Sequence, residues 1–180
     1  MCILKTERLE LFPWEATEEM AIALYEYARN KEVGPAAGWE PHETPRHSFE
    51  IIRDLFIPQG DLAIRFSATG EIIGTIGLMP DKRREDVKSR ELGYSLARHM
   101  WGKGIMTEAA RALINYGFSE LKLDVIAIAI HPENERSLSV ARKCGFTREG
   151  LLRKGCIGYT GDLRDLVIGS ITREEWKEKY

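Results

Sequence analysis

Two glycines separated by a single residue stand where a helix is expected to begin. Gly102 and Gly104 follow an extended segment, residues 91–97, and precede a stretch whose apolar residues recur at helical spacing. The start of a helix offers backbone N–H groups without intrahelical partners and the positive end of the helix dipole. Glycine also removes the Cβ that would keep a phosphate away from the backbone. The pattern predicts an anion-binding loop that a diphosphate would fit.

Two familiar glycine-rich phosphate loops do not match this segment. A dinucleotide-binding fingerprint has a third glycine three residues after the second, where this chain has Thr107, and a Walker loop has Gly-Lys-Ser/Thr at the helix start. An unrelated nucleotide-binding module is therefore disfavoured. Taken alone, Gly-x-Gly before a helix is as typical of a plain turn as of a ligand site, so other features of the chain must distinguish the two.

The composition is that of one globular domain spanning residues 1–180. Hydrophobic residues make up 43% of the chain and charged residues 30%, which is enough apolar material for one substantial core. The formal net charge is −2, and no dense basic stripe with interleaved aromatic residues occurs in the sequence. We therefore expect no direct nucleic-acid partner.

The positions of cysteine and histidine point away from a metal site. The 3 cysteines and 4 histidines show none of the ligand spacings of zinc sites, and an odd number of cysteines does not complete a disulfide framework. No apolar run at the N-terminus has the length of a signal peptide, and no segment approaches the roughly 20 apolar residues of a membrane span. We expect a cytoplasmic monomer or homodimer without metal or membrane partners.

The order of predicted elements indicates an α/β fold. Periodicity and turn residues predict strands over residues 3–12, 61–67, 72–78, 91–97, 123–130, 151–155 and 163–171. Helices are predicted over residues 16–29, 45–57, 105–118, 135–144 and 173–179. Thr17 and Asn134 are the expected N-caps, and Gly145 should end the helix that Asn134 begins. These elements predict a mixed central sheet of six to seven strands with helices on both faces.

The segment between the first two predicted helices, residues 33–45, is rich in turn residues but contains Trp39 and His42. Exposed loops seldom carry tryptophan. Trp39 either fills the edge of the core beneath two helices or forms a wall of a binding cleft. Both interpretations stay open from the residues alone.

The glycine loop and the order of elements resemble the GNAT superfamily of N-acetyltransferases. The superfamily pattern is Gln/Arg-x-x-Gly-x-Gly/Ala at the start of the helix after the fourth strand, and residues 99–104, His-Met-Trp-Gly-Lys-Gly, match both glycines but begin with histidine. The run Asn-Glu-Arg-Ser at residues 134–137 and Gly-Phe at 145–146 also match. Residues 6–9, 93–94, 107–109 and 174–176 resemble the branch of ribosomal-protein N-acetyltransferases.

This resemblance implies that acetyl-coenzyme A (acetyl-CoA) is the cofactor. It implies that residues 91–97 line the acetyl and pantetheine arm and that the glycine loop holds the diphosphate. Backbone amides and Lys103 would then meet the phosphate charge. The residues expected to bind the cofactor are Leu96, His99, Trp101, Gly102, Lys103, Gly104, Ile105, Met106, Thr107, Asn134 and Ser137.

The implied reaction is attack of a primary amine on a thioester, which needs a neutral amine, a stabilised oxyanion and a protonated thiolate. Many superfamily members use a tyrosine seven residues after the asparagine as the acid, and this chain has Ala141 there. By analogy with the branch, we expect Ser137 to be the acid. We expect Glu91, acting through water, to be the base, with three reserves: His131, Glu149 and Asp165.

The acceptor is expected to contact Trp39, His42 and Tyr94, and a backbone N–H near residues 94–96 is expected to stabilise the oxyanion. A weak base favours an α-amine, because α-amino groups titrate near pKa ~7.7–8.0 and lysine near ~10.4. A protein N-terminus or an amino-acid-like small molecule is therefore the expected acceptor. The missing tyrosine and the uncertain base leave an alternative, a GNAT-fold protein that binds acyl-CoA without turning it over.

Overall fold

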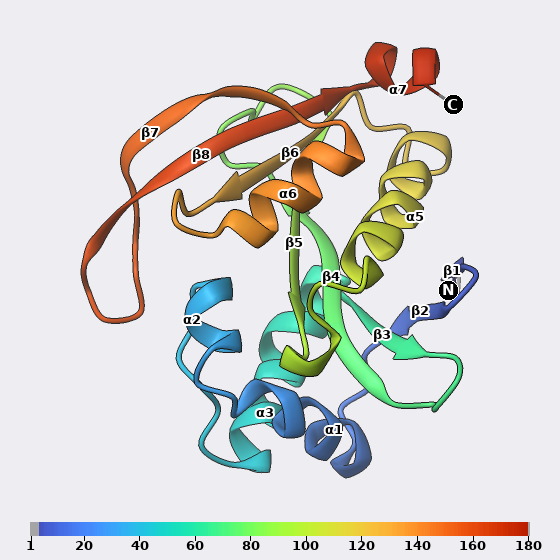
Figure 1. Cartoon of the computed structure of the whole chain (residues 1–180), viewed down its shortest axis with the longest axis vertical. Helices are drawn as coiled ribbons and strands as arrows, with labels where there is room; N and C mark the ends of the chain where they lie inside the picture. Colours follow the sequence, from blue (N-terminus) through green and yellow to red (C-terminus); the bar gives the residue numbers. More distant parts are fainter. Residues whose placement is uncertain (1–3, 180) are drawn as a thin grey trace. The chain divides into compact units, whose positions relative to one another are not determined.

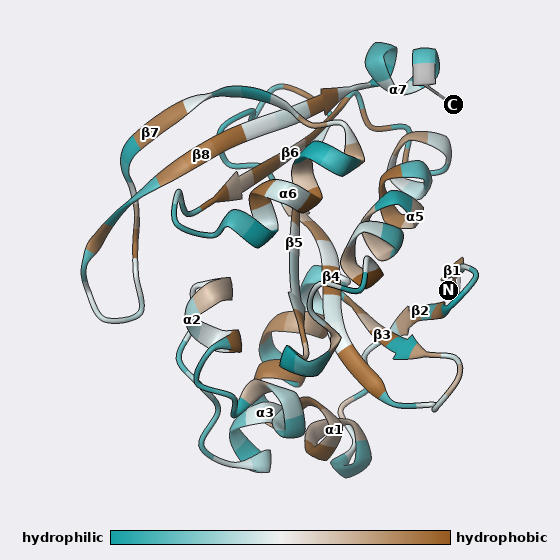
Figure 2. Cartoon of the chain, in the orientation of Figure 1, coloured by the Kyte–Doolittle hydropathy of each residue, from teal (hydrophilic) through white to brown (hydrophobic). Residues whose placement is uncertain are grey.

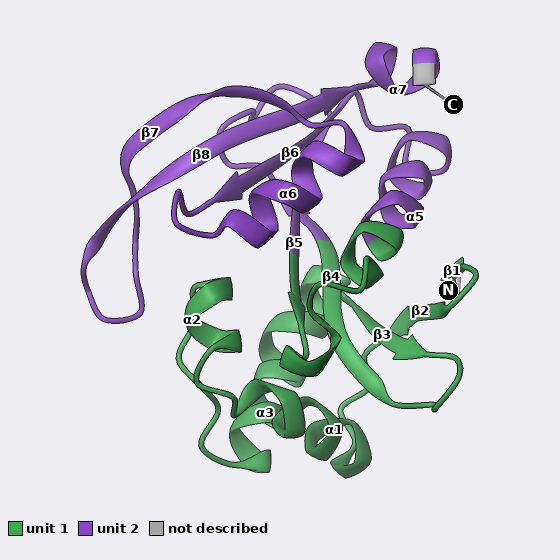
Figure 3. Cartoon of the chain, in the orientation of Figure 1, with its two compact units in different colours: residues 1–77, 94–109 green, residues 78–93, 110–180 purple. Residues whose placement is uncertain are grey.

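The computed structural model describes residues 4–179. The chain forms two compact units (Figure 3): unit 1 contains residues 1–77 and 94–109, and unit 2 contains residues 78–93 and 110–180. Two strands and one helix continue from one unit into the other. The prediction of a single domain stays a prediction.

The elements in chain order are shown in Figure 1. The strands are β1 (Leu4–Lys5), β2 (Leu9–Pro13), β3 (Leu62–Phe66), β4 (Ile72–Pro80), β5 (Ser89–Leu96), β6 (Val125–Ile130), β7 (Thr147–Ile157) and β8 (Leu163–Thr172). The helices are α1 (Glu18–Ala28), α2 (Val33–Ala37), α3 (Pro45–Ile51), η1 (Ile52–Phe56), α4 (Ile57–Gln59), η2 (Arg98–Met100), α5 (Ile105–Ser119), α6 (Glu135–Cys144) and α7 (Arg173–Lys179).

The described strands form an eight-stranded sheet in the order β1-β2-β3-β4-β5-β6-β8-β7. β5 and β6 are parallel, whereas β2 with β3, β6 with β8 and β7 with β8 are antiparallel. The mixed sheet is as predicted, but the predicted count of six to seven strands is wrong. Part of the difference lies in the single strand predicted for residues 3–12, because residues 4–5 and 9–13 form two separate strands. A turn divides them, because Thr6 N–H donates to Leu9 O (2.9 Å) and Leu9 N–H donates to Thr6 Oγ1 (3.0 Å).

Several predicted helix ends are confirmed by their hydrogen bonds. Thr17 accepts from Met20 N–H at the start of α1, and Asn134 accepts from Ser137 N–H at the start of α6. Gly145 ends α6 at φ 92°, in the left-handed region that glycine adopts without strain.

The segment around the second predicted helix differs from expectation in two ways. Residues 45–57 form α3 followed by a π-helical turn, η1, in which Ile57 N–H bonds to Ile52 O. Pro58 lies in the short α4 that follows, which Gly60 ends at φ 75°. Residues 33–37, predicted as part of a turn-rich loop, form α2. Local turn propensity therefore gave way to tertiary packing in this part of unit 1.

Each unit has its own buried apolar residues, which appear as brown stretches on strands such as β4 and β8 in Figure 2. In unit 1 α1 buries one face, to which Met20, Leu24 and Tyr27 belong, and α1 packs against α3. In unit 2 the buried side chains include Phe118 of α5 and Ile126 of β6. Apolar residues at helical and strand spacing therefore supply the buried residues of both units.

Candidate active site

The glycine loop lies between η2 and α5 in unit 1. Gly102 and Gly104 both have φ of +76°, which strains any other residue type. A Cβ built on Gly102 would meet nothing within 4 Å, and one on Gly104 would meet only Arg8 Nη2 at 3.7 Å. Glu108 N–H bonds back to Gly104 O (3.1 Å), so the first turn of α5 starts directly at the loop. Open space therefore lies over a glycine backbone at a helix N-terminus, which suits an anion.

Two side chains hold this loop in shape. Arg8, the residue before β2, donates from Nη1 to Lys103 O (3.1 Å) and from Nε to Glu108 Oε2 (2.7 Å). The Arg8 backbone N–H donates to the other oxygen of Glu108 (2.9 Å), and Thr6 donates to the same oxygen. The Glu108 carboxylate thus ties the first turn of α5 to the start of β2. The resemblance to the ribosomal-protein branch includes the two motifs that contain these residues, 6–9 and 107–109. It does not indicate that the two motifs are in contact.

The side chains predicted to bind the cofactor have different surroundings. Lys103 is exposed, and no ion pair joins its ammonium to another described residue. His99 is exposed too, with Nε2 3.3 Å from Glu71 Oε1. Trp101 donates from Nε1 to Leu96 O (2.7 Å). The side chains of Leu96, Ile105 and Met106 are buried, so these three residues would reach a ligand through their backbone.

The strand before the loop, β5, pairs with two neighbours over different stretches. In unit 1 the residue that follows it, Ala97, donates its N–H to Ile73 O of β4 (2.7 Å). In unit 2 the parallel register with β6 covers Ser89 to Glu91, opposite Val125 to Ala127. The pairing between β5 and β6 therefore stops before Tyr94. The predicted oxyanion donor near residues 94–96 stays a prediction.

Glu91, the predicted base, belongs to a charged network in unit 2. Its carboxylate is hydrogen-bonded by the Arg83 guanidinium. Arg83 also lies near Asp81, with Nε 3.7 Å from Oδ1. Arg84 joins Asp81 (2.8 Å) to Glu149 (2.6 Å). Glu91 would have to release Arg83, or share it, in order to accept a proton.

Glu149, a reserve candidate, is held in its charged form by its neighbours. A hydrogen bond from Ser170 Oγ (2.6 Å) is the main cause that lowers the pKa of Glu149, and the Arg84 guanidinium lowers it further. A carboxylate with a lowered pKa is a weak proton acceptor. This arrangement favours a structural role for Glu149.

Asn134 and Ser137, the residues expected to serve the pantetheine arm and the thiolate, stand together at the start of α6 in unit 2. The Asn134 amide oxygen accepts from the Ser137 backbone N–H (3.1 Å). This hydrogen bond uses the backbone of Ser137 and does not involve its hydroxyl. Both side chains are at least partly accessible, whereas Ala141 is buried. The N-cap is confirmed, and the roles of both residues toward the cofactor stay predictions.

Trp39 and His42, the predicted acceptor wall, belong to an aromatic cluster in unit 1. The Trp39 ring lies 5.1 Å from the His42 ring, which lies 4.6 Å from the His47 ring. His42 is buried, and its Nδ1 lies 2.8 Å from Ser48 Oγ. Burial, with a smaller contribution from the charge of His47, lowers the pKa of His42 to about 4. His42 is therefore a neutral imidazole at neutral pH.

A buried tyrosine on α1 carries a hydrogen-bonded hydroxyl. The Tyr27 hydroxyl on α1 lies 2.8 Å from Thr75 Oγ1 on β4 and 3.4 Å from Ser95 Oγ on β5. Burial raises the pKa of Tyr27 to about 12, so the phenol keeps its proton. These partners lie 48 and 68 positions away in the chain, so the local sequence gives no sign of them.

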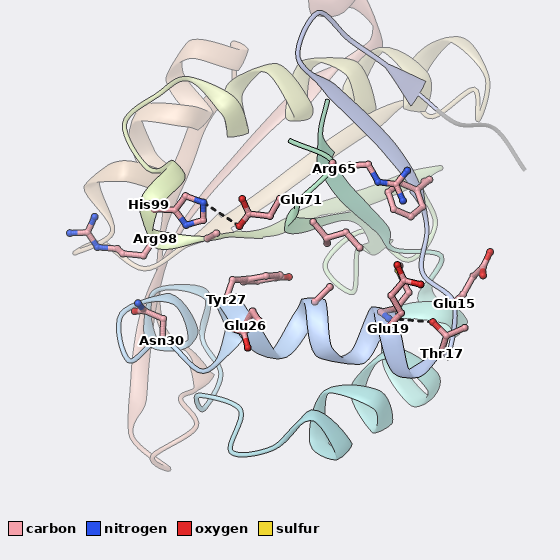
Figure 4. A pocket seen from close by; sticks show the side chains of 16 residues that line it. Glu15, Thr17, Glu19, Glu26, Tyr27, Asn30, Arg65, Glu71, Arg98 and His99 are labelled. Atoms are coloured by element: carbon pink, nitrogen blue, oxygen red, sulfur yellow. Dashed lines mark hydrogen bonds and ion pairs between the residues drawn. The ribbon is translucent and has the colours of Figure 1, made fainter. Parts of the chain in front are cut away.

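A groove of about 1020 Å³ runs along α1 in unit 1 (Figure 4). We call it the α1 groove, and its lining includes Glu15, Glu19, Glu26, Glu71, Tyr27 and His99. Two arginines also line it, but Arg65 is paired with Glu10 and Arg98 with Glu32. The groove therefore presents more carboxylate than unpaired cationic charge. Of the predicted site residues, His99 alone lies in its described lining.

Comparison with known proteins places this arrangement in a family. A family model described as an acetyltransferase (GNAT) domain matches residues 8–147, which is most of the chain. This chain belongs to the GNAT acetyltransferase family. The matched range includes the glycine loop, the whole of β5 and Asn134, the N-cap of α6.

Two curated relatives of this GNAT acetyltransferase are themselves named for N-acetyl transfer. The N-acetyltransferase p20 of Bacillus licheniformis is 38% identical, covering 96% of this chain and 97% of the relative. The [ribosomal protein uS5]-alanine N-acetyltransferase of Escherichia coli is 34% identical over 85 residues, covering 47% of this chain and 43% of that protein. The predicted N-acetyltransferase activity and the likeness to the ribosomal-protein branch are confirmed.

Solved structures agree with this assignment. A GNAT acetyltransferase from Bacillus anthracis has a TM-score of 0.83 at 26% identity, covering 97% of this chain and 100% of that chain. The microcin C7 self-immunity acetyltransferase MccE, solved with acetyl-CoA and AMP, has a TM-score of 0.76 at 26% identity, covering 93% of each chain. The predicted GNAT fold is confirmed.

The part of the chain that the structure describes contains neither a cluster of potential metal ligands nor a helix suited to span a membrane. No group of three or more His, Cys, Asp or Glu residues among the described ones could hold a metal ion. Within the same residues, no helix combines the length and apolar character needed to cross a membrane.

Proposed function

We propose that this acetyltransferase binds acetyl-CoA with its diphosphate over residues 102–107 and transfers the acetyl group to a primary amine. The glycine loop is the observation that carries the proposal. Both glycines have φ of +76° and open space where a Cβ would stand, directly before α5. Backbone N–H groups of a first helical turn bind anions well, and the exposed Lys103 adds a positive charge. The residues present therefore fit a diphosphate.

The remaining roles follow the family resemblance. Bound acetyl-CoA would supply the acetyl group as a thioester. Leu96, Ile105 and Met106 would contribute backbone groups, because their side chains are buried. Asn134 would bond the pantetheine arm, and Ser137 would donate a proton toward the thiolate. A backbone N–H near Tyr94 would stabilise the oxyanion.

The acceptor is proposed to be an α-amine, either a protein N-terminus or an amino-acid-like small molecule. An α-amino group needs roughly 3 kcal/mol less deprotonation free energy at neutral pH than a lysine side chain. The E. coli relative named for a ribosomal-protein alanine supports a protein N-terminus. The carboxylates of the α1 groove favour a cationic amine, and Trp39, His42 and Tyr94 stay proposed contacts.

The glycine loop is tested by Gly102→Ala. The added methyl group would occupy the space proposed for the diphosphate, so the Kd for acetyl-CoA measured by calorimetry should rise at least tenfold, about 1.4 kcal/mol. Alanine is strained at positive φ wherever it stands. Gly60→Ala is the matched control, because Gly60 has φ of +75° and nothing within 4 Å of a built Cβ. Equal affinity in folded Gly102→Ala and wild type would remove the assignment.

The acceptor is tested with two matched peptides, one with a free N-terminal alanine and one with an acetylated N-terminus and a single lysine. Thiol release from acetyl-CoA at pH ~7.4 should be faster with the free N-terminus. Faster turnover on the lysine peptide would contradict the α-amine proposal. Binding of acetyl-CoA without thiol release to either peptide or to a panel of free amino acids would favour the non-catalytic alternative.

A further inference from the structure

One arginine of unit 1 bonds both to the glycine loop and to the helix that follows it. The Arg8 guanidinium donates from Nη1 to Lys103 O (3.1 Å), and Lys103 stands between the two glycines. The same guanidinium donates from Nε to Glu108 Oε2 (2.7 Å), and its Nη2 lies 2.7 Å from that oxygen. Because Arg8 directly precedes β2, it joins the loop and the first turn of α5 to the start of a strand.

The Glu108 carboxylate is fixed through its other oxygen as well. The Arg8 backbone N–H donates to Oε1 (2.9 Å), and the Thr6 hydroxyl donates to the same atom. Burial alone would raise the pKa of Glu108, but the hydrogen bonds from Thr6 and Arg8 outweigh it and lower that pKa. Glu108 therefore stays charged at neutral pH, and its pairing with Arg8 persists.

The carbonyl that Arg8 holds lies in the part of the chain with the most backbone freedom. Gly102 and Gly104 flank it, and glycine loses more conformational entropy on ordering than any other residue. The one atom within 4 Å of a Cβ built on Gly104 is Arg8 Nη2, at 3.7 Å. A loop that is ordered before its ligand arrives spends no binding free energy on ordering. The bonds of Arg8 therefore act where they bear most on ligand affinity.

We infer that Arg8 positions the glycine loop for the cofactor's diphosphate, by holding Lys103 O and Glu108 at one distance from each other. The inference rests on the proposed function, which puts the diphosphate over residues 102–107. Nε, Nη1 and Nη2 of Arg8 all have partners within the protein, so Arg8 is a positioning residue that acts through the loop. Neither the sequence motifs nor the family resemblance gives Arg8 this part.

Arg8→Lys separates the geometry of this contact from its charge. Lysine keeps a positive charge beside Glu108. Its single ammonium on a flexible stem lacks the planar fork that reaches Lys103 O and the carboxylate together. Arg53→Lys is the matched control, because Arg53 also makes two hydrogen bonds to one carboxylate, that of Asp54, within unit 1.

The first measurement is the Kd for acetyl-CoA by calorimetry. In Arg8→Lys it should rise roughly fivefold or more, because part of the binding free energy is then spent on ordering the loop. The KM for acetyl-CoA should rise in step while kcat at saturation stays within about twofold, as for a loss of uniform binding. With S-acetylpantetheine, a donor that lacks the diphosphate, the KM of Arg8→Lys should equal that of wild type.

Thr6→Val reaches the same carboxylate without touching the guanidinium. It removes the hydroxyl donor to Glu108 and should raise the Kd for acetyl-CoA roughly twofold. Arg53→Lys should bind as wild type does. A folded Arg8→Lys with wild-type affinity would show that charge alone is needed and would overturn the inference. An equal rise of the KM for S-acetylpantetheine would overturn it too, because the defect would then not concern the diphosphate.

A readout in the ligand-free protein completes the test. The Glu108 amide bonds to Gly104 O (3.1 Å), so its hydrogen exchange reports opening of the turn that follows the loop. Exchange at this amide should be faster in Arg8→Lys and unchanged in Arg53→Lys. If Arg8→Lys leaves it unchanged, the inference fails. If Arg8→Lys speeds it but wild type binds no acetyl-CoA, Arg8 orders the loop and the proposed function fails instead.

Discussion

Asp61 in unit 1 and Asp81 in unit 2 are both buried aspartates, with 7% and 5% of their surface exposed. Asp81 Oδ2 is bonded by the Arg84 guanidinium (2.8 Å), and its Oδ1 accepts from Arg83 N–H (3.0 Å). Asp61 lies against Gly77, and its Oδ1 has no hydrogen-bond partner among the described residues. The two aspartates are buried to a similar extent, but their hydrogen-bond and ion-pair partners differ.

This difference separates a structural carboxylate from a reactive one. A buried carboxylate that contacts a cation and a backbone N–H donor has its charge compensated. Its role is to hold the surrounding segment in one conformation. A buried carboxylate without such partners is held near its titration point by desolvation. Strained or uncompensated groups of this kind gather at functional sites. The comparison therefore assigns Asp81 to the architecture of the loop before β5, whereas the charge of Asp61 is left uncompensated by folding.

The largest expected effect is on the pH dependence of stability in Asp61→Asn. The pKa of Asp61 rises from its usual 3.8 to about 6 on folding. The folded protein therefore holds this proton more tightly than the unfolded chain, and wild type loses about 3 kcal/mol as pH rises from ~4 to ~6. Asp61→Asn should be more stable than wild type by about that amount at pH ~8 and similar at pH ~4, measured by urea unfolding.

Asp81→Asn is the opposite arm of the same measurement. This substitution removes one partner of a buried ion pair, so it should lower the free energy of unfolding at pH ~8 by up to about 3 kcal/mol. This value is at the low end of the range for buried pairs, because Arg84 keeps its second partner, Glu149. A stabilised Asp81→Asn, or an Asp61→Asn whose stability follows the wild-type pH curve, would show that the two aspartates do not differ as proposed.

The parts of this fold that were predictable depend on local rules. Thr17 and Asn134 cap helices through their own side chains, and Gly145 ends α6 in a conformation that few other residues adopt. The glycine loop combines a local turn with a helix start. Such signals lie within a few residues of one another, so one sequence is enough to interpret them.

The parts that were missed depend on residues far apart in the chain. The Glu108 bond to Arg8 joins positions 100 residues apart, and the Tyr27 hydroxyl meets Thr75 and Ser95 across 48 and 68 residues. Periodicity shows that Tyr27 is buried, but not what its hydroxyl meets. Asp61 looked like the polar first residue of a strand. One sequence signal did bear on it, a glycine inside the next strand, which often marks the close approach of another group.

That glycine provides the smallest expected effect and the sharpest test of the Asp61 site. In Gly77→Ala the new Cβ must displace the carboxylate, so unfolding free energy should fall by about 2 kcal/mol, within the range for overpacked cores. Gly150→Ala, a strand glycine with nothing within 4 Å of a built Cβ, is the control and should change stability by less than about 0.5 kcal/mol.

The double variant Gly77→Ala with Asp61→Ala then separates a specific clash from a general strand effect. If the carboxylate causes the clash, removing it should free the new methyl group at position 77 from any penalty, and the double variant should be more stable than the sum of the two single changes by at least about 1 kcal/mol. Additive changes would mean that Gly77 is needed for the strand itself. In that case Asp61 would have no site of its own, and its contrast with Asp81 would rest on charge partners alone.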